Sequence, residues 1–310
     1  MLTRNNLLIF FSLFLYSSLI FGFIIGEDLN GGAIIDFNAT AEIAKSFATD
    51  FKYNFFNYDE LKERHSPVIH IIIAQLIQIG LEIQTVQLIL LHFCLFICLY
   101  FYKSLRIIFN GVDKLWLKYL SLIVFLSPTF RALSIWPDSR IFGLLFFTVS
   151  LYYFLKFKFK RKSFKYVFAN SLFLAVSSYF SPNFCIFALF FFIEYLLYYK
   201  KKKEFIYYII LNIVLAFPAF YYLFIIDVFF LYIKGTPGAH EYLSNHSFIS
   251  FFSNKIMIIS SIIFFYLIPI IVAKKERIHQ IIFDKYLLIV VLFFLLNILF
   301  FNYELEFTGG

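Results

Sequence analysis

Several uninterrupted apolar runs in this chain are long enough to cross a lipid bilayer. They include Leu7–Ile25, Val86–Tyr102, Phe205–Ile226 and Ile256–Ala273, and a membrane-spanning α-helix needs about 20 mostly apolar residues. Apolar residues make up 62% of the sequence, well above the share in soluble domains. A transmembrane β-barrel would instead show alternating residues in segments of about ten. The sequence therefore predicts an all-α integral membrane protein, formed as a single transmembrane domain over residues 1–310.

Lysine and arginine gather in four short segments between these runs, and basic segments mark the cytoplasmic side of a membrane protein. They lie at residues 103–118, 156–165, 200–203 and 274–285. The chain must cross an even number of times between two such segments. We therefore predict nine transmembrane helices, with the N-terminus in the cytoplasm and the C-terminus outside, at residues 7–25, 86–102, 119–131, 140–156, 166–180, 183–199, 205–226, 255–273 and 286–302. Short runs of positive charge between membrane helices set the orientation of the chain in the membrane and bind anionic lipid headgroups. They do not indicate a nucleic-acid partner.

The first outer loop, residues 26–85, is long and acidic, whereas connections between helices are usually a few residues. The segment 67–81 within it is apolar, but it is short and interrupted by Gln75 and Gln78. We place it at the outer interface as a juxtamembrane or re-entrant helix, since a crossing there would break the parity of the basic segments. Eight of the nineteen acids lie between residues 26 and 66: Glu27, Asp28, Asp36, Glu42, Asp50, Asp59, Glu60 and Glu63. Such a loop suggests chemistry at the outer membrane surface.

Asp36 is the first candidate for a catalytic base. It heads a segment of helical character that reaches Ala44 and is expected to lie against the outer membrane face. A carboxylate held there, partly out of water, could accept a proton from a hydroxyl group of a sugar or a lipid. Asp28, at the mouth of the first span, is the second candidate. The structural alternatives are N-capping of a helix by Asp36 and a solvated membrane exit at Asp28.

Three motifs follow one another along the predicted outer face. They are Asp36 with the small residue Ala44 eight positions later, His65-Ser66-Pro67 before an apolar helix, and Ser127-Pro128 followed by Trp136-Pro137-Asp138-Ser139-Arg140. In this order the chain resembles, over roughly residues 1–200, the GT-C superfamily of membrane glycosyltransferases, which includes protein O-mannosyltransferases and lipid A sugar transferases. Phe37 stands where many relatives have Glu, and one proline of their His-Pro-Pro signature is missing.

The resemblance implies an inverting glycosyltransferase that moves a sugar from a polyprenyl-phosphate donor to a lipid, glycan or protein acceptor. Asp36 or Asp28 would be the general base. The leaving phosphate needs cations, and arginine binds phosphate in a fork and stays protonated. Arg64, Arg131 and Arg140 are the arginines of the predicted outer face. The alternative for Arg131 and Arg140, which flank Asp138, is that they anchor the interface or form an Arg–Asp pair. The remaining donor-site candidates are His65, which would contact the phosphate or cap a helix, and Asp138.

The second outer loop, residues 227–254, contains Asp227, His240 and Glu241. It forms either an acceptor-site loop or an ordinary connector. Some GT-C enzymes use divalent cations, so a cation stays open as a cofactor. No His-x-x-x-His pattern or pair of carboxylates at ligand spacing assigns a metal site in this sequence.

Other membrane proteins with this composition give three alternatives. A transporter or a lipid or oligosaccharide flippase tends to place charged residues in the membrane, but the predicted spans here hold few, among them His92 and Glu194. A polysaccharide polymerase or ligase usually carries its long outer loop late in the chain. A scaffold would not explain the acidic loop. We expect an outer-facing active site in a bacterial inner membrane, or the endoplasmic reticulum of a eukaryote. The short tail after the last span fits either a complete chain or a truncated longer one.

Overall fold

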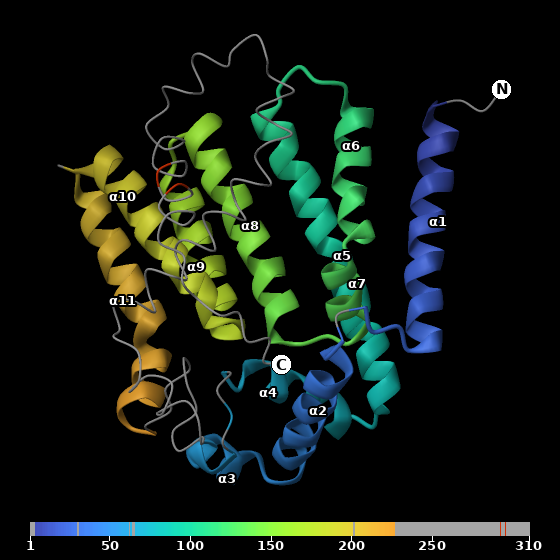
Figure 1. Cartoon of the computed structure of the whole chain (residues 1–310). Helices are drawn as coiled ribbons and strands as arrows, with labels where there is room; N and C mark the ends of the chain where they lie inside the picture. The colour runs from blue at the N-terminus through green and yellow to red at the C-terminus, as the bar shows by residue number, and fades with distance from the viewer. Residues whose placement is uncertain are drawn as a thin grey trace. The chain divides into compact units, whose positions relative to one another are not determined.

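The computed structural model of the chain describes residues 4–29, 31–61, 63, 66–200 and 202–226, together with the isolated Leu292 and Leu295. By its internal contacts the chain divides into two compact units, residues 1–234 and 235–310, and the account below concerns the first (Figure 1). Every regular element described in this unit is a helix. The predicted second outer loop and the predicted span 255–273 lie outside the described residues, and so does the predicted span 286–302 apart from Leu292 and Leu295.

Five helical segments of the described chain are long and apolar enough to cross a membrane, which confirms the prediction of an all-α integral membrane protein. They match the predicted spans 7–25, 86–102, 140–156, 183–199 and 205–226. The five segments are α1 (Arg4–Ile25), α5 (Ile83–Ile108), α8 (Ser139–Phe159), η3 (Pro182–Ile186) with α10 (Phe187–Tyr199), and α11 (Lys203–Phe224).

The predicted span 119–131 is not one continuous helix, because the chain forms three short helices there. The residue before a proline is disfavoured in the α conformation, and Ser127 is extended with φ −71° and ψ 121°. Its hydroxyl then accepts a hydrogen bond from the Phe130 N–H at 3.3 Å, so it caps the next helix with Pro128 in the first turn. The three helices are α6 (Lys114–Leu122), η2 (Ile123–Leu126) and α7 (Pro128–Ile135).

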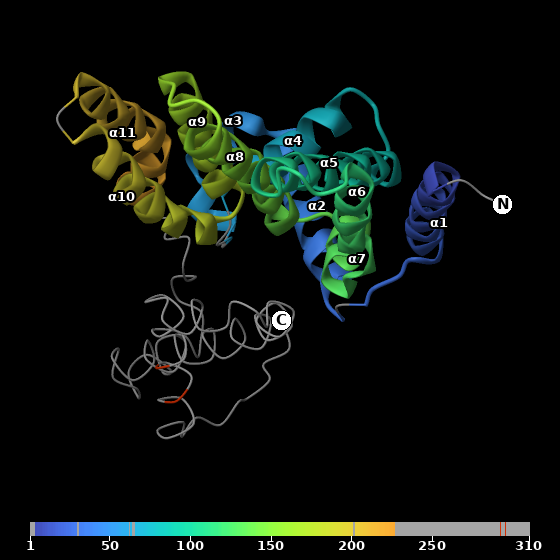
Figure 2. The ribbon, with the colours of Figure 1, turned by 90° about the horizontal axis from the view of Figure 1, so that it is seen from above.

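Helix α8 lies at the centre of this unit. It packs along α5 on one side and along α9 (Phe164–Phe180) on the other. In its most apolar stretch 56% of the residues are buried, compared with 11% in α11. Figure 2 shows α1 at one edge of the unit and α10 with α11 at the other. The 17 residues of α9 extend about 25 Å at 1.5 Å per residue, slightly less than the hydrocarbon thickness of a bilayer.

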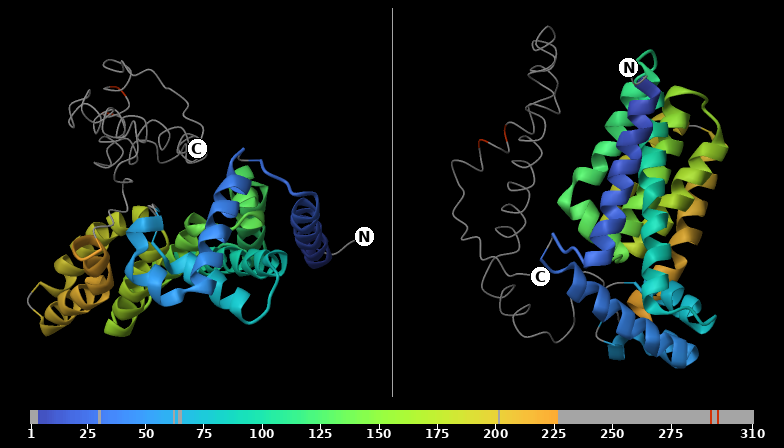
Figure 3. Two further views of the ribbon diagram at one scale, coloured as in Figure 1. Left: turned by 90° about the horizontal axis from the view of Figure 1, so that it is seen from below. Right: turned by 90° about the vertical axis from the view of Figure 1, so that its right-hand side faces the viewer.

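The helices of the first loop gather at one end of the unit (Figures 1 and 3), which we call the loop end. The basic segments 103–118, 156–165 and 200–203 lie at the opposite end, which we call the basic end (Figure 1).

The segment predicted as a juxtamembrane helix forms α4. Its 11 residues extend only about 16 Å, which is too short to cross a bilayer. The loop helices are α2 (Ala33–Thr49), α3 (Phe51–Phe56), η1 (Tyr58–Leu61) and α4 (Val68–Gln78).

An aromatic cluster attaches these loop helices to the end of α11. Phe47, Tyr58 and Tyr222 pack together, and the Tyr222 hydroxyl donates a hydrogen bond to the Phe55 carbonyl at 3.3 Å. Burial raises the pKa of Tyr58 well above its usual value, so its hydroxyl stays protonated at neutral pH. This hydroxyl lies 3.2 Å from Nδ1 of the buried His70. The loop is therefore a packed cap and not a loose connection.

Candidate active site at the loop end

The first span ends in a turn that aims Glu27 back at its own helix. Gly26 has φ +70°, a left-handed conformation that glycine adopts at low cost. The Gly26 N–H donates to the Phe23 carbonyl at 3.3 Å, and the Glu27 N–H donates to the Gly22 carbonyl at 2.8 Å. This pair of bonds is the Schellman arrangement of a helix C-terminus. It fixes the Glu27 backbone beside the last turn of α1.

Glu27 forms a two-pronged ion pair with Arg131 of α7. Arg131 Nε and Nη2 donate to the two carboxylate oxygens, each at 2.7 Å, and the guanidinium also donates to the Ser18 hydroxyl at 3.2 Å and the Ser18 carbonyl at 3.1 Å. The Arg131 and Glu27 side chains are only 11% and 15% exposed. Trp136 Nε1 donates to the Glu27 carbonyl at 3.0 Å. The pair thus joins α1 to α7 and leaves Arg131 one of its five N–H groups for any other partner.

The carboxylate of Glu27 lies against α1 in the space left by the missing side chain of Gly22. A Cβ atom on Gly22 would lie 2.5 Å from Glu27 Oε2, 2.9 Å from Ile135 Cδ1 and 3.1 Å from Arg131 Nη2. Real Cβ atoms do not approach other atoms so closely, so a larger residue would push the ion pair away from the helix. Gly22 and the Glu27–Arg131 pair therefore depend on each other for their positions.

Asp28 serves as a cap for α2. Its carboxylate accepts hydrogen bonds from the backbone N–H groups of Gly31 at 3.1 Å, Ala33 at 3.4 Å and Ile34 at 3.3 Å. A carboxylate at this position satisfies free N–H groups and favours the positive end of the helix dipole. The helix-capping carboxylate expected at Asp36 is therefore Asp28, since Asp36 lies inside the first turn of α2.

Asp36, Asp138 and Arg140 form one cluster, although Asp36 and Arg140 are 104 positions apart in the sequence. Arg140 Nη2 donates to Asp36 Oδ2, and Arg140 Nε donates to Asp138 Oδ2. Asp138 is the N-cap of α8, since its other oxygen accepts from the N–H groups of Arg140 at 2.8 Å and Ile141 at 3.3 Å. Asp138 is 7% exposed, whereas Asp36 and Arg140 are 42% and 36% exposed. The cluster is thus anchored on one side and open on the other.

The open side of this cluster keeps hydrogen-bonding capacity. Within the part of the chain that the structure describes, Asp36 Oδ1 and Arg140 Nη1 have no hydrogen-bond partner. An unengaged carboxylate oxygen can accept a proton, and unengaged guanidinium N–H groups can bind an anion. Phe37, on the same helix as Asp36, is buried with its ring 5.8 Å from that of Trp136, so it packs the helix against the chain before Asp138.

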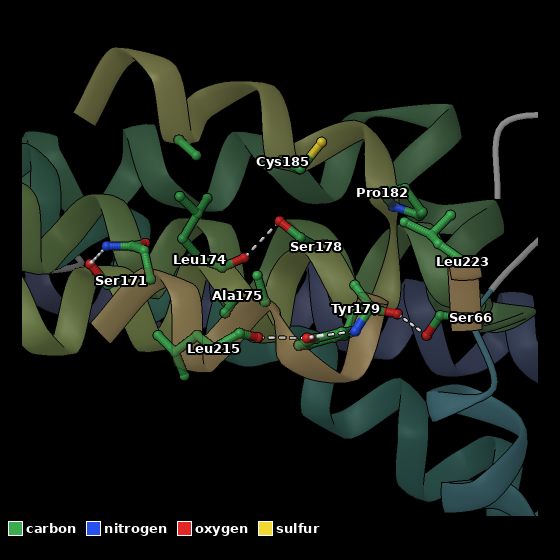
Figure 4. A pocket seen from close by; sticks show the side chains of 14 residues that line it. Ser66, Ser171, Leu174, Ala175, Ser178, Tyr179, Pro182, Cys185, Leu215 and Leu223 are labelled. Carbon is green, nitrogen blue, oxygen red and sulfur yellow. Dashed lines mark hydrogen bonds between the residues drawn. The ribbon is translucent and has the colours of Figure 1, made fainter. Parts of the chain in front are cut away.

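A cavity of about 410 Å³ lies between α9 and α11 (Figure 4). Its wall is mostly apolar, and Ser66 reaches it from the loop end, where the Ser66 hydroxyl donates to the Tyr179 carbonyl. Pro218 lies inside α11 and has no N–H group for the hydrogen bonds of the helix. Beside it, the Tyr179 hydroxyl accepts a hydrogen bond from the Ala219 N–H at 3.3 Å and donates one to the Leu215 carbonyl. A second space of about 470 Å³ continues between α10 and α11, since it shares Ala188, Asn212 and Ala216 with the first.

Five of the sequence candidates lie outside the described residues: Arg64, His65, Asp227, His240 and Glu241. Their placement relative to the Asp36–Arg140 cluster stays a prediction. In the described ranges no group of three or more His, Cys, Asp and Glu side chains is placed to hold a metal ion. The divalent cation stays a possibility that only the family resemblance raises.

Sequence reasoning missed that Glu27 is the partner of Arg131, and it did not single out Ser18 or Gly22. Two signals were present. The first is Gly26-Glu27, a glycine that can end a helix followed by an acid at the end of the first span. The second is Gly22, one helical turn earlier, where the missing side chain lets another side chain lie against the helix. The contact itself joins residues 104 positions apart, which no local pattern specifies.

Comparisons of the chain with models of protein families, with curated proteins and with solved structures found no match. Function is therefore argued from the residues at the loop end.

Proposed function

We propose that this protein is a membrane glycosyltransferase that moves a sugar from a polyprenyl-phosphate donor to a hydroxyl acceptor at the loop end. The observation that carries the proposal is the half-exposed contact between Asp36 and Arg140, held in place by Asp138. It joins a proton acceptor and an anion-binding cation in one group of side chains. Both are what displacement of a sugar from a phosphate requires.

In the proposed reaction Asp36 takes the proton of the acceptor hydroxyl through a carboxylate oxygen. The acceptor oxygen forms a bond to the anomeric carbon, and the bond from that carbon to the phosphate oxygen breaks with inversion. Arg140 donates its remaining N–H groups to the departing phosphate, whose charge is highest at this stage. Asp138 does not touch the substrate, since it positions the guanidinium through Nε.

The apolar cavity supports a lipid-linked donor. Its lining includes Pro182 and Cys185, and Gly143, one turn after Arg140 in α8, packs against the neighbouring Ser181 and Phe184. The cavity wall and the start of α8 therefore belong to one packed region. With the basic segments at the opposite end, the positive-inside rule would place the cluster on the outer face, in a bacterial inner membrane or in the endoplasmic reticulum.

The test uses the purified full chain in lipid nanodiscs with a panel of polyprenyl-phosphate sugars labelled in the sugar. We expect one of them to lose its sugar to an added glycan, lipid or peptide acceptor, and the Asp36→Asn variant to lose this activity. A flippase or transporter would move labelled lipid across the bilayer while its sugar stays attached. A polymerase or ligase would transfer a preassembled oligosaccharide and leave single sugars in place. Either result would replace the proposal.

A further inference from the structure

Three lysines from three helices gather around four tyrosines at the basic end. Lys103 lies near the end of α5, Lys156 in the last turn of α8 and Lys165 in the first turn of α9. We call this group the lysine–tyrosine cluster. Its tyrosines are Tyr100, Tyr152, Tyr153 and Tyr166. The side chains of Lys103, Lys156 and all four tyrosines are half-buried, and Lys165 is exposed.

Neighbouring lysines in this cluster share an aromatic ring. The Tyr152 ring centre lies 4.6 Å from Lys156 Nζ and 5.9 Å from Lys103 Nζ. The Tyr166 ring centre lies 5.5 Å from Lys156 Nζ and 5.1 Å from Lys165 Nζ. The fold therefore holds three positive charges around shared rings, and the cation–π contacts offset only part of the repulsion between these charges.

No carboxylate neutralises this cluster within the described ranges, since none of its three lysines forms an ion pair there. Lys158, two residues after Lys156, pairs with Glu194 at 2.8 Å, so the basic end does neutralise lysines elsewhere. Lys165 also lies at the positive end of the α9 dipole. That end has no acid in its first turn and no side-chain cap from Ser163.

We propose that the lysine–tyrosine cluster binds the phosphate of an anionic phospholipid in the leaflet at the basic end. Ammonium groups, tyrosine hydroxyls and the uncapped α9 N-terminus are all donors to phosphate oxygens. The ends of membrane-length helices lie at the depth of lipid headgroups, and basic pockets between such helices bind them. The half-buried rings contact the glycerol and upper acyl chain. This site is at the opposite end from the Asp36–Arg140 cluster and does not depend on the glycosyltransferase proposal.

The test titrates dihexanoyl phosphatidylglycerol into the full chain in an uncharged detergent, with dihexanoyl phosphatidylcholine as the neutral probe. We expect tighter binding of the anionic lipid. A direct ammonium contact to the phosphate contributes at least about fivefold in affinity, so Lys103→Gln/Lys156→Gln should weaken binding about 25-fold. The matched control is Lys162→Gln/Lys202→Gln, which removes the same charge at the same end. These lysines also lie over rings, at 4.5 Å from Phe157 and 4.4 Å from Tyr198, and the control should lose less than fivefold.

Equal losses in the two double variants would overturn the proposal, because they indicate diffuse attraction by net charge. Displacement of the lipid by inorganic phosphate at the same concentration would overturn it too, because the site would then bind free phosphate. If the double variant loses its folded thermal transition in phosphatidylcholine micelles, Lys103→Gln and Lys156→Gln are titrated singly, with about a fivefold loss expected for each. Single variants that bind like the parent would reject the site.

Discussion

Arg131 and Arg140 both bind acids of the first loop, but their surroundings differ. Arg131 and Glu27 are at most 15% exposed and bonded through both carboxylate oxygens. Arg140 and Asp36 are at least 36% exposed and bonded through a single oxygen of Asp36. In the first pair both carboxylate oxygens and four of the five N–H groups of Arg131 bond to protein partners, whereas in the second pair Asp36 Oδ1 and Arg140 Nη1 have no partner among the described residues.

This difference separates an arginine that holds the fold from one that is available to a substrate. A buried charge that loses its partner is costly, about 3–5 kcal/mol, so Arg131 cannot leave Glu27 for a passing phosphate without a large loss. An exposed pair contributes about 0–1 kcal/mol, so Arg140 can turn part of its fork to a ligand at low cost. The sequence treated both as equal phosphate candidates, and the structure distinguishes them.

The largest expected effect is on stability at the buried pair. Arg131→Ala leaves the Glu27 carboxylate, which is only 15% exposed, without its partner, so we expect a loss of up to about 3 kcal/mol in the free energy of unfolding. The measurement is denaturant unfolding of the full chain in detergent. Asp36→Ala is the control for the exposed pair, since Asp36 is 42% exposed and Arg140 keeps Asp138 as its partner, and we expect it to lose under about 1 kcal/mol. Glu27→Ala/Arg131→Ala should lose less than the sum of the single changes. Similar small losses for Arg131→Ala and Asp36→Ala would remove the distinction between the two pairs.

The next effect is on activity at the open cluster. Asp36→Asn keeps the size of the side chain but removes the proton acceptor, so we expect sugar transfer to fall about 100-fold or more while the unfolding midpoint stays near that of the parent. Glu42→Gln is the matched control on the same helix, since Glu42 is exposed and its ion-pair partner within the described ranges is the exposed Lys45, at 2.7 Å. If Asp36→Asn transfers sugar normally and Asp28→Asn does too, neither carboxylate is the base, and the enzyme proposal fails.

The membrane helices were predictable because they follow from length and hydropathy alone. The starts of α5, α8 and α11 lie within three residues of the predicted spans, since bilayer thickness constrains them. The break between α6 and α7 was missed, although its cause, Ser127-Pro128, was noted as a motif. Proline is common in the first turn of a helix, and Pro128 begins α7. The residues on both sides of Ser127-Pro128 are apolar, so hydropathy alone did not show the boundary between the two helices.

The site was predictable as a set of residue types but not as a set of contacts. Asp36, Asp138 and Arg140 were each selected for their chemistry and their predicted outer placement, and the fold brings them together. The partners of Arg131 and Arg140 depend on how α1, α2 and α8 pack, which is a long-range property. Periodicity and spacing carry no information about it.

A smaller effect is expected where the buried pair approaches its helix. Gly22→Ala introduces a Cβ atom 2.5 Å from Glu27 Oε2, and overpacking of this kind costs about 1–3 kcal/mol. We expect lower stability in the same unfolding assay with little change in the activity of the folded fraction. Gly32→Ala is the control, since nothing lies within 4 Å of the position of its Cβ. If the folded fraction of Gly22→Ala transfers sugar more slowly than the parent, the Glu27–Arg131 pair and the Asp36–Arg140 cluster are coupled.

The smallest effect concerns how Arg140 would bind the donor. Arg140→Ala removes a charge-assisted hydrogen bond, which contributes about 1.5–3 kcal/mol, so we expect kcat/KM for the donor to fall about tenfold or more. Arg140→Lys keeps the charge but cannot bind Asp36, Asp138 and a phosphate at once, because an ammonium lacks the planar fork. It should recover only part of the loss, with most of the remaining defect in the KM for the donor. Full recovery by lysine would mean that charge alone is needed, and unchanged kinetics in both variants would return Arg140 to the role that Arg131 has, a link between helices.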